Sequence, residues 1–100
     1  MFSAEVVGKD GAATVVRLAG ELDIATAPQV TACLSAVGDG DIIVDVAGLT
    51  FLDSSGLSVL LAAYLRASDR GFSFVVQSPS SCVSRVLQVS GVDHLLKIAS

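Results

Sequence analysis

The segment Asp53-Ser54-Ser55-Gly56 contains the residues of this sequence whose types and order are best suited to chemistry. It precedes apolar residues at helical spacing, so a helix is expected to begin here. A serine hydroxyl at a helix start can carry a phosphate, whose charge faces free amides and the positive end of the helix dipole. The same hydroxyl, on Ser54 or Ser55, can instead cap the helix by accepting a hydrogen bond from a first-turn amide. Residue types alone favour the cap.

A phosphate on Ser54 would change the surface around the helix start rather than unfold the protein. It adds about −1.5 to −2 charges and three acceptor oxygens. A partner docked on that surface would meet both steric bulk and new charge, and each loss of about 1.4 kcal/mol lowers its affinity tenfold. The segment is therefore suited to a switch of protein binding.

Enzymatic chemistry has little support in the remaining residues. A hydrolase needs a nucleophile, a base and an oxyanion hole, yet the single histidine, His94, lies in an apolar tail and Gly-x-Ser-x-Gly does not occur. No glycine-rich loop is present to hold a nucleotide, so we expect no cofactor and no catalysis. Cys33 and Cys82 fit no common zinc or redox spacing, and both are expected to be small buried or half-buried hydrophobes.

Composition and charge exclude several other classes of protein. The 100 residues are 52% hydrophobic but only 5% aromatic, which predicts one core built from Val, Leu, Ile and Ala. The net charge is −4 and the six basic residues are scattered, so no basic stripe is available for direct nucleic-acid binding. No apolar run approaches the ~20 residues of a membrane span, and no secretory signal precedes the first strand. A cytoplasmic protein without membrane contact is expected.

The first half of the chain predicts a hairpin followed by a helix. Residues 4–8 and 13–19 are rich in β-branched side chains, and the Asp-Gly pair between them indicates a hairpin turn. Apolar residues at helical spacing run from about 25 to 37, with Pro28 in the first turn, where its missing N–H is harmless. Asp23 or Thr26 is the expected cap of this helix.

The second half predicts alternating strands and helices. Residues 41–46 form a nearly continuous apolar run, which is typical of a central strand covered on both faces. A helix is expected from about 55 to 69, a strand at 72–77, and a third helix after Ser78-Pro79-Ser80-Ser81. The order ββαβαβα predicts an α/β fold with a mixed sheet of about four strands and about three helices. Its first strand pair is antiparallel and the rest is parallel.

Three motifs together resemble the STAS domain of bacterial anti-sigma factor antagonists. They are Leu18-Ala19-Gly20-Glu21-Leu22-Asp23, Ile42-Ile43-Val44-Asp45-Val46 and Phe51-Leu52-Asp53-Ser54-Ser55-Gly56-Leu57. The resemblance runs from about residue 6 to residue 98 and implies a STAS-like fold, with residues 1–100 as a single domain. In that family the first serine of the Asp-Ser-Ser-Gly segment is phosphorylated by a partner that is both anti-sigma factor and serine kinase. By position that residue is Ser54.

The resemblance also implies how the switch works. The unphosphorylated protein binds the anti-sigma kinase and frees its sigma factor, and the phosphorylated form is released until a serine phosphatase restores it. Asp23 matches a family position at the kinase-binding surface, and the alternative role as a helix cap stays equally open. Asp53 is expected to orient the acceptor loop through bonds from its side chain to the backbone. Ser55 is expected to be a cap or a hydrogen-bond partner rather than a second acceptor.

The face of the second helix that is not needed for the core carries small and apolar side chains, namely Ser58, Val59, Ala62, Ala63 and Arg66. This face is either a partner surface or the contact of a neighbouring helix. The predicted partner-binding residues are Asp23, Asp53, Ser54, Ser55, Gly56, Ser58 and Val59. The alternative function is an unphosphorylated STAS scaffold or small-ligand module of a transport or stress-sensing complex, because STAS domains occur in such assemblies too.

Overall fold

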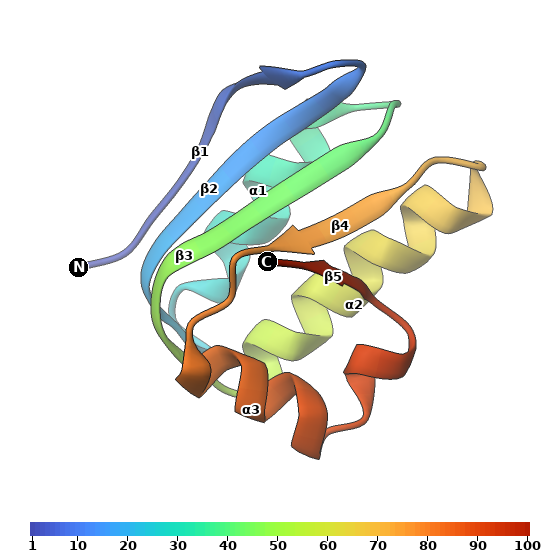
Figure 1. Ribbon diagram of the computed structural model, residues 1–100. Helices are drawn as coiled ribbons and strands as arrows, with labels where there is room; N and C mark the ends of the chain where they lie inside the picture. Colours follow the sequence, from blue (N-terminus) through green and yellow to red (C-terminus); the bar gives the residue numbers. More distant parts are fainter.

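The computed structural model describes residues 1–100 and contains one sheet of five strands with three α-helices (Figure 1). In chain order the elements are β1 (Ser3–Asp10), β2 (Ala13–Leu22), α1 (Ala27–Val37), β3 (Ile42–Leu52), α2 (Ser54–Asp69), β4 (Phe74–Gln77), α3 (Ser81–Val89), the short 3-10 helix η1 (Val92–His94) and β5 (Lys97–Ala99). The strands are ordered β1-β2-β3-β4-β5, with β1 antiparallel to β2 and the other pairs parallel. The predicted α/β class and mixed pairing are confirmed.

The fifth strand is the difference from the predicted count of about four. β5 has only three residues and extends the sheet beyond β4, where Val75 pairs with Lys97. The amide of Ser78 donates to the carbonyl oxygen of Ala99 over 2.7 Å and holds the strand end. Three residues are too few to show the alternation by which a strand is recognised in a sequence, so the pattern did not indicate β5.

The hairpin and the start of α1 follow the sequence closely. Asp10 pairs with Ala13, and Gly11 has a φ of 62°, a left-handed conformation that glycine adopts without steric cost. Pro28 lies in the first turn of α1, as expected. The hairpin therefore delivers β2 as the first strand of the parallel part of the sheet.

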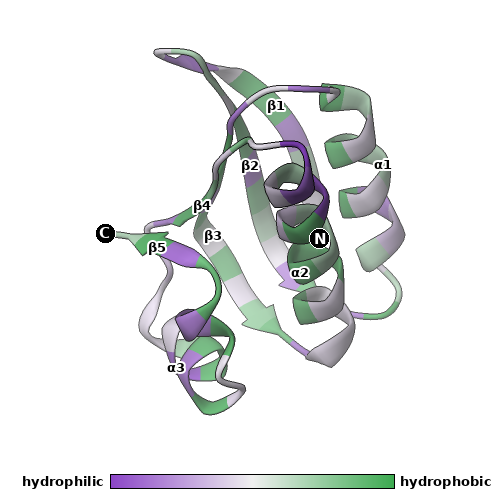
Figure 2. Ribbon diagram, turned by 90° about the vertical axis from the view of Figure 1, so that its right-hand side faces the viewer, coloured by the Kyte–Doolittle hydropathy of each residue, from purple (hydrophilic) through white to green (hydrophobic).

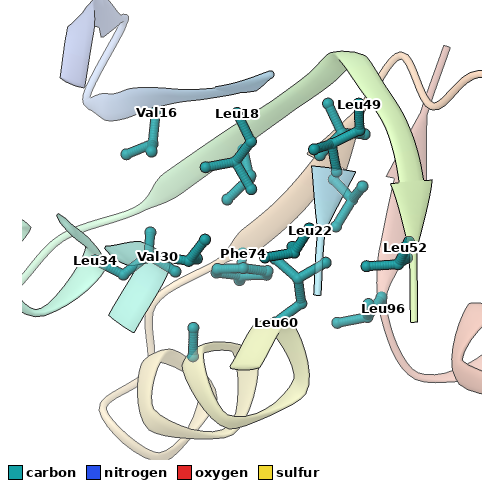
Figure 3. Close-up of a cluster of buried hydrophobic side chains, with 14 of the residues drawn as sticks. Val16, Leu18, Leu22, Val30, Leu34, Leu49, Leu52, Leu60, Phe74 and Leu96 are labelled. Atoms are coloured by element: carbon teal, nitrogen blue, oxygen red, sulfur yellow. The ribbon is translucent and has the colours of Figure 1, made fainter. Parts of the chain in front are cut away.

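The helices form unequal layers. Figures 1 and 2 show α1 and α2 side by side against one face of the sheet, whereas α3 lies at one end, on the other side. Alternate residues of β2 and β3 point toward α1 and α2 and form the centre of the core, among them the fully buried Val16, Leu18, Val44 and Val46 (Figure 3). The core thus lies between one sheet face and two helices.

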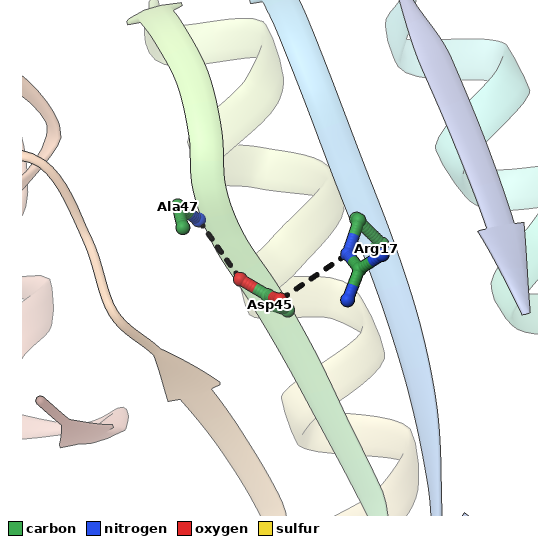
Figure 4. Close-up of polar contacts among 3 residues, drawn as sticks. All are labelled: Arg17, Asp45 and Ala47. Atoms are coloured by element: carbon green, nitrogen blue, oxygen red, sulfur yellow. Dashed lines mark hydrogen bonds and ion pairs between the residues drawn. The ribbon is translucent and has the colours of Figure 1, made fainter. Parts of the chain in front are cut away.

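The other sheet face is only partly covered, which corrects the expectation that β3 is buried on both faces. Ile43 and Asp45 alternate with the buried residues of β3 and are half-buried. Arg17 of β2 reaches across to Asp45 over 3.3 Å on this face, and no helix lies over the pair (Figure 4). The two long crossovers, through α1 and α2, lie on the same side because both add a strand in the same direction with the same hand.

β3 is also longer than predicted, because it continues through two irregularities in its pairing with β2. The register shifts between Arg17 and Ala19 and again between Gly20 and Glu21. Asp45 Oδ1 accepts a hydrogen bond from Ala47 N over 3.0 Å, which gives a partner to an amide in the first irregular stretch. The strand therefore ends at Leu52, directly before the acceptor segment.

The two cysteines differ in exposure. Cys33 on α1 is half-buried, but Cys82 on α3 is exposed, so the expectation of a buried or half-buried Cys82 is wrong. Cys82 lies in the first turn of a short helix that packs on one side only, through Val83 and Leu87. Burial, and secondly the Glu5 carboxylate, raise the pKa of the Cys33 thiol. No helix has both the length and the apolar character that crossing a membrane requires.

Candidate functional site

Two turns meet at the sheet edge where β2 and β3 end. These strands are parallel, and Leu22 at the end of β2 pairs with Leu52 at the end of β3. The amide of Asp53 donates to the carbonyl oxygen of Leu22 over 3.2 Å and links the two turns directly. We call residues 23–26 the first edge turn and residues 53–56 the second edge turn. The structure thus brings Asp23 next to the acceptor segment, at the strand edge where open α/β sheets place their sites.

The second edge turn is held by Asp53. Its backbone is extended, and its Oδ1 accepts hydrogen bonds from Ser55 N at 2.9 Å and from Gly56 N at 3.1 Å. Asp53 is therefore the cap of α2, and the expectation of a cap at Ser54 or Ser55 is wrong. An aspartate one residue earlier does this better, because its carboxylate bears a full charge at the positive end of the helix.

Ser54 is the first residue of α2 and is exposed. Its hydroxyl makes no hydrogen bond within the protein, while its carbonyl oxygen accepts one from Ser58 Oγ over 2.9 Å. Because Asp53 provides the cap, the Ser54 hydroxyl is not needed to hold the helix start. An approaching enzyme could reach it without unfolding the turn.

The free amides expected to face a phosphate on Ser54 are in fact occupied. Asp53 Oδ1 binds the amides of Ser55 and Gly56, and the Asp53 carbonyl oxygen accepts from Leu57 N at 3.0 Å. A phosphate on Ser54 would therefore lie beside a carboxylate instead of replacing solvent on free donors. Its charge would be directed outward, toward solvent or a partner.

Gly56 is required by packing. It is buried, and a Cβ atom there would lie 2.5 Å from Leu52 Cδ1 and 2.7 Å from Leu22 Cγ. Only glycine lets the first turn of α2 come this close to the ends of β2 and β3. Gly56 therefore sets the position of Ser54 without being displayed itself.

The first edge turn uses the same device. Asp23 Oδ1 accepts from Ala25 N at 3.0 Å and from Thr26 N at 3.1 Å. Thr26 Oγ1 donates to the carbonyl oxygen of Glu21 over 2.9 Å and accepts from Asp23 N over 2.9 Å. Asp23 thus holds the turn before α1, and because it is only half-buried the same side chain is also open to a partner.

Sequence reasoning missed Ile24, which occupies in the first edge turn the position that Ser54 occupies in the second. Each follows the aspartate that holds its turn, and the Ile24 side chain is 77% exposed. Phe51, which pairs with Glu21 near the end of β3, is 44% exposed. A large aliphatic residue between an aspartate and a helix start, outside any apolar periodicity, is the signal that could have indicated Ile24.

The outward face of α2 is divided between the two roles considered for it. Ala63 is buried and Val59 is half-buried against the core, on the side of α2 that packs with α1. Ser58 and Ala62 are exposed. The surface next to Ser54 therefore consists of Ser58 and the edge of Val59.

The charge at this sheet edge is negative. Glu21, Asp23 and Asp53 lie in or beside the two edge turns, whereas the basic residues of α2, Arg66 and Arg70, follow Ser54 by three turns or more of helix. No cluster of three His, Cys, Asp or Glu side chains is placed to hold a metal ion.

Comparisons with known proteins agree on one family. Residues 6–97 match the family described as "Mlab, STAS domain". The anti-sigma F factor antagonist of Paenibacillus polymyxa is 32% identical over 84% of this chain and 75% of that protein. The anti-sigma-B factor antagonist of Listeria monocytogenes is 27% identical over 97% of this chain and 88% of that protein.

Solved structures give the same result. The unphosphorylated form of the anti-sigma factor antagonist SpoIIAA superposes with a TM-score of 0.77 and 29% identity, over 100% of this chain and 89% of that chain. The phosphorylated form of SpoIIAA, from Bacillus, superposes with a TM-score of 0.71 and 28% identity, over 100% of this chain and 92% of that chain.

Proposed function

The chain belongs to the STAS domain family, and we propose that it acts as an anti-sigma factor antagonist controlled by phosphorylation of Ser54. Its unphosphorylated form binds an anti-sigma factor that is also a serine kinase, and a sigma factor is freed. Phosphorylation ends this binding, and a serine phosphatase restores it. In this role the protein works in the cytoplasm and changes transcription without touching DNA. The exposed Ser54 hydroxyl, free of intramolecular hydrogen bonds, is the observation that carries the proposal.

The partner surface in this proposal is centred on the two edge turns. Asp23 and Asp53 hold the turns, Ser54 and Ile24 are displayed by them, and Ser58 continues the surface along α2. Ser55, Gly56 and Val59 contribute from beneath, through a backbone amide or through packing. Such a surface is ordered before binding, so little conformational entropy is lost when a partner docks.

The charge at this edge explains how phosphorylation would act. Glu21, Asp23 and Asp53 already make it negative, and no basic side chain lies in either turn to neutralise a phosphate. About −1.5 to −2 further charges would therefore act on the partner rather than on this protein. A partner group that packs against Ser54 would have to be desolvated beside that charge, which weakens binding strongly.

Phosphorylation is tested by incubating the protein with the anti-sigma factor kinases of its host and ATP, followed by mapping of the phosphate by mass spectrometry. We expect one phosphate, on Ser54. Ser54→Ala abolishes the labelling, while Ser58→Ala, which removes a hydroxyl one helical turn away on the same surface, leaves it in place. Labelling at Ser58, or of both variants equally, contradicts the assignment.

Binding is tested with the same kinase and the variants Ser54→Ala and Ser54→Asp. Alanine keeps the affinity of the unphosphorylated protein, and aspartate lowers it, by less than phosphate does because it carries less charge. Equal affinity of both variants and of the unmodified protein contradicts the charge mechanism. If no host kinase modifies Ser54 and the protein instead binds a transporter or stress-sensing subunit, it is a STAS scaffold.

A further inference from the structure

A crevice of about 190 Å³ lies between the C-terminal ends of α1 and α2, at the opposite end of α2 from Ser54. Small residues on the two helices leave it open, and its lining is apolar where the helices meet the sheet. The apolar lining residues are Leu34, Ile42, Ala63, Ala67 and Phe72. Since the core beneath is closely packed, the crevice is a surface feature with an apolar floor.

Two cations lie at the rim of this crevice in a chain whose net charge is −4. Arg66 and Arg70 are one helical turn apart on α2, and Arg70 pairs with Asp39 from the loop after α1. The other ion pair of the protein, Arg17 with Asp45, is on the open sheet face. Arg66 therefore has an exposed guanidinium without a carboxylate partner, beside an apolar floor.

We propose that this crevice binds a small amphipathic carboxylate, with the carboxylate on Arg66 and a short aliphatic tail on the apolar floor. A guanidinium presents a planar fork of donors that matches a carboxylate and forms two parallel hydrogen bonds with it. The tail is removed from water against Leu34, Ala63 and Phe72. The available volume equals that of about six liquid waters and is below the range for drug-sized ligands, which limits the tail to a few carbons.

This site is separate from the edge turns, so the proposal goes beyond the proposed function and does not depend on it. A titration followed by amide NMR tests it with three probes: hexanoate, hexanol and inorganic phosphate. We expect hexanoate to shift the amides of Gly38, Gly40 and Ala67 and to leave those of Gly11 and Gly91 unchanged. Hexanol lacks the charge and phosphate lacks the tail, so each binds about tenfold more weakly or less.

Two variants and a matched control locate the contacts. Arg66→Gln removes the guanidinium and lowers hexanoate affinity about tenfold, and Ser35→Phe, at an exposed position of the rim, fills the crevice and lowers it at least as much. Arg85→Gln makes the same change of charge on an exposed position of α3 and leaves the affinity unchanged. Unchanged hexanoate binding in Arg66→Gln, an equal loss in Arg85→Gln, or phosphate binding as tight as hexanoate overturns the proposal.

Discussion

The two edge turns have the same hydrogen-bond geometry but present different chemistry. In each, an aspartate Oδ1 accepts from the amides two and three residues later, at 3.0 and 3.1 Å for Asp23 and at 2.9 and 3.1 Å for Asp53. The residue after each aspartate is exposed, and it is Ile24 in one turn and Ser54 in the other. The third position carries the bonded hydroxyl of Thr26 or the side-chain-free Gly56.

This difference shows which positions carry function and which carry structure. Both aspartates satisfy backbone amides, so neither turn needs the side chain that follows to hold its helix. That following position is free to vary, and in this protein it supplies an apolar contact in one turn and a reactive hydroxyl in the other. The chemistry of the site thus depends on one residue in each turn, and its geometry on the aspartates and on Gly56.

The largest effect on stability is expected from Gly56→Ala. The added Cβ would approach Leu52 Cδ1 to 2.5 Å and Leu22 Cγ to 2.7 Å, so the first turn of α2 must move away from the strand ends. Overpacking of this kind costs about 1–3 kcal/mol, measured as the loss of unfolding free energy in urea. The matched change in the first edge turn, Thr26→Ala, removes a hydroxyl and costs about 1 kcal/mol. A larger loss for Thr26→Ala would show that the two third positions are not used as described.

Most of the framework around these turns could be predicted from the sequence, because it rests on long apolar patterns. The hairpin, Pro28 in the first turn of α1, and the parallel order of the later strands all follow from local periodicity and turn residues. The exposed face of β3 could not be predicted from its apolar run. Val44 and Val46 are buried while Ile43 is only half-buried, and which face the helices cover depends on the crossovers.

The site was predicted in outline but not in its hydrogen bonds. The position of Asp53-Ser54-Ser55-Gly56 at a helix start is confirmed, yet the cap is Asp53 rather than a serine, since helix bounds are shifted by one residue. Ile24 was missed because exposure of a single aliphatic residue depends on how its turn is oriented, which no periodicity records.

A smaller loss is expected when either aspartate is removed. Asp53→Ala and Asp23→Ala each leave two amides without their acceptor, and loss of such a cap costs about 1 kcal/mol. The aspartate-to-asparagine variants keep an acceptor oxygen and lose less. Urea unfolding of the four variants measures this, and a loss in one turn only would break the equivalence of the two turns.

A loss of about 0.5 kcal/mol is expected from Asp45→Asn, which tests the support of β3 below the second edge turn. The variant keeps an oxygen to accept from Ala47 N and removes the ion pair with Arg17, whose side chain is 54% exposed (Figure 4). Exposed ion pairs contribute little. Asp45→Ala removes both contacts and is the control, so equal losses in the two variants would assign the whole effect to the ion pair.

The smallest effect on stability is expected from Ile24→Ser, which makes the displayed residue of the first edge turn the same as that of the second. The Ile24 side chain is 77% exposed and packs against little, so the unfolding free energy stays within about 0.5 kcal/mol of the original. Binding to the kinase that modifies Ser54 falls about tenfold, because an exposed aliphatic side chain in an ordered turn gains most when a partner covers it. Val89, 82% exposed at the end of α3, provides the matched control: Val89→Ser should change neither stability nor binding. Equal binding by Ile24→Ser and Val89→Ser would show that the first edge turn lies outside the contact, and that only the second meets the partner.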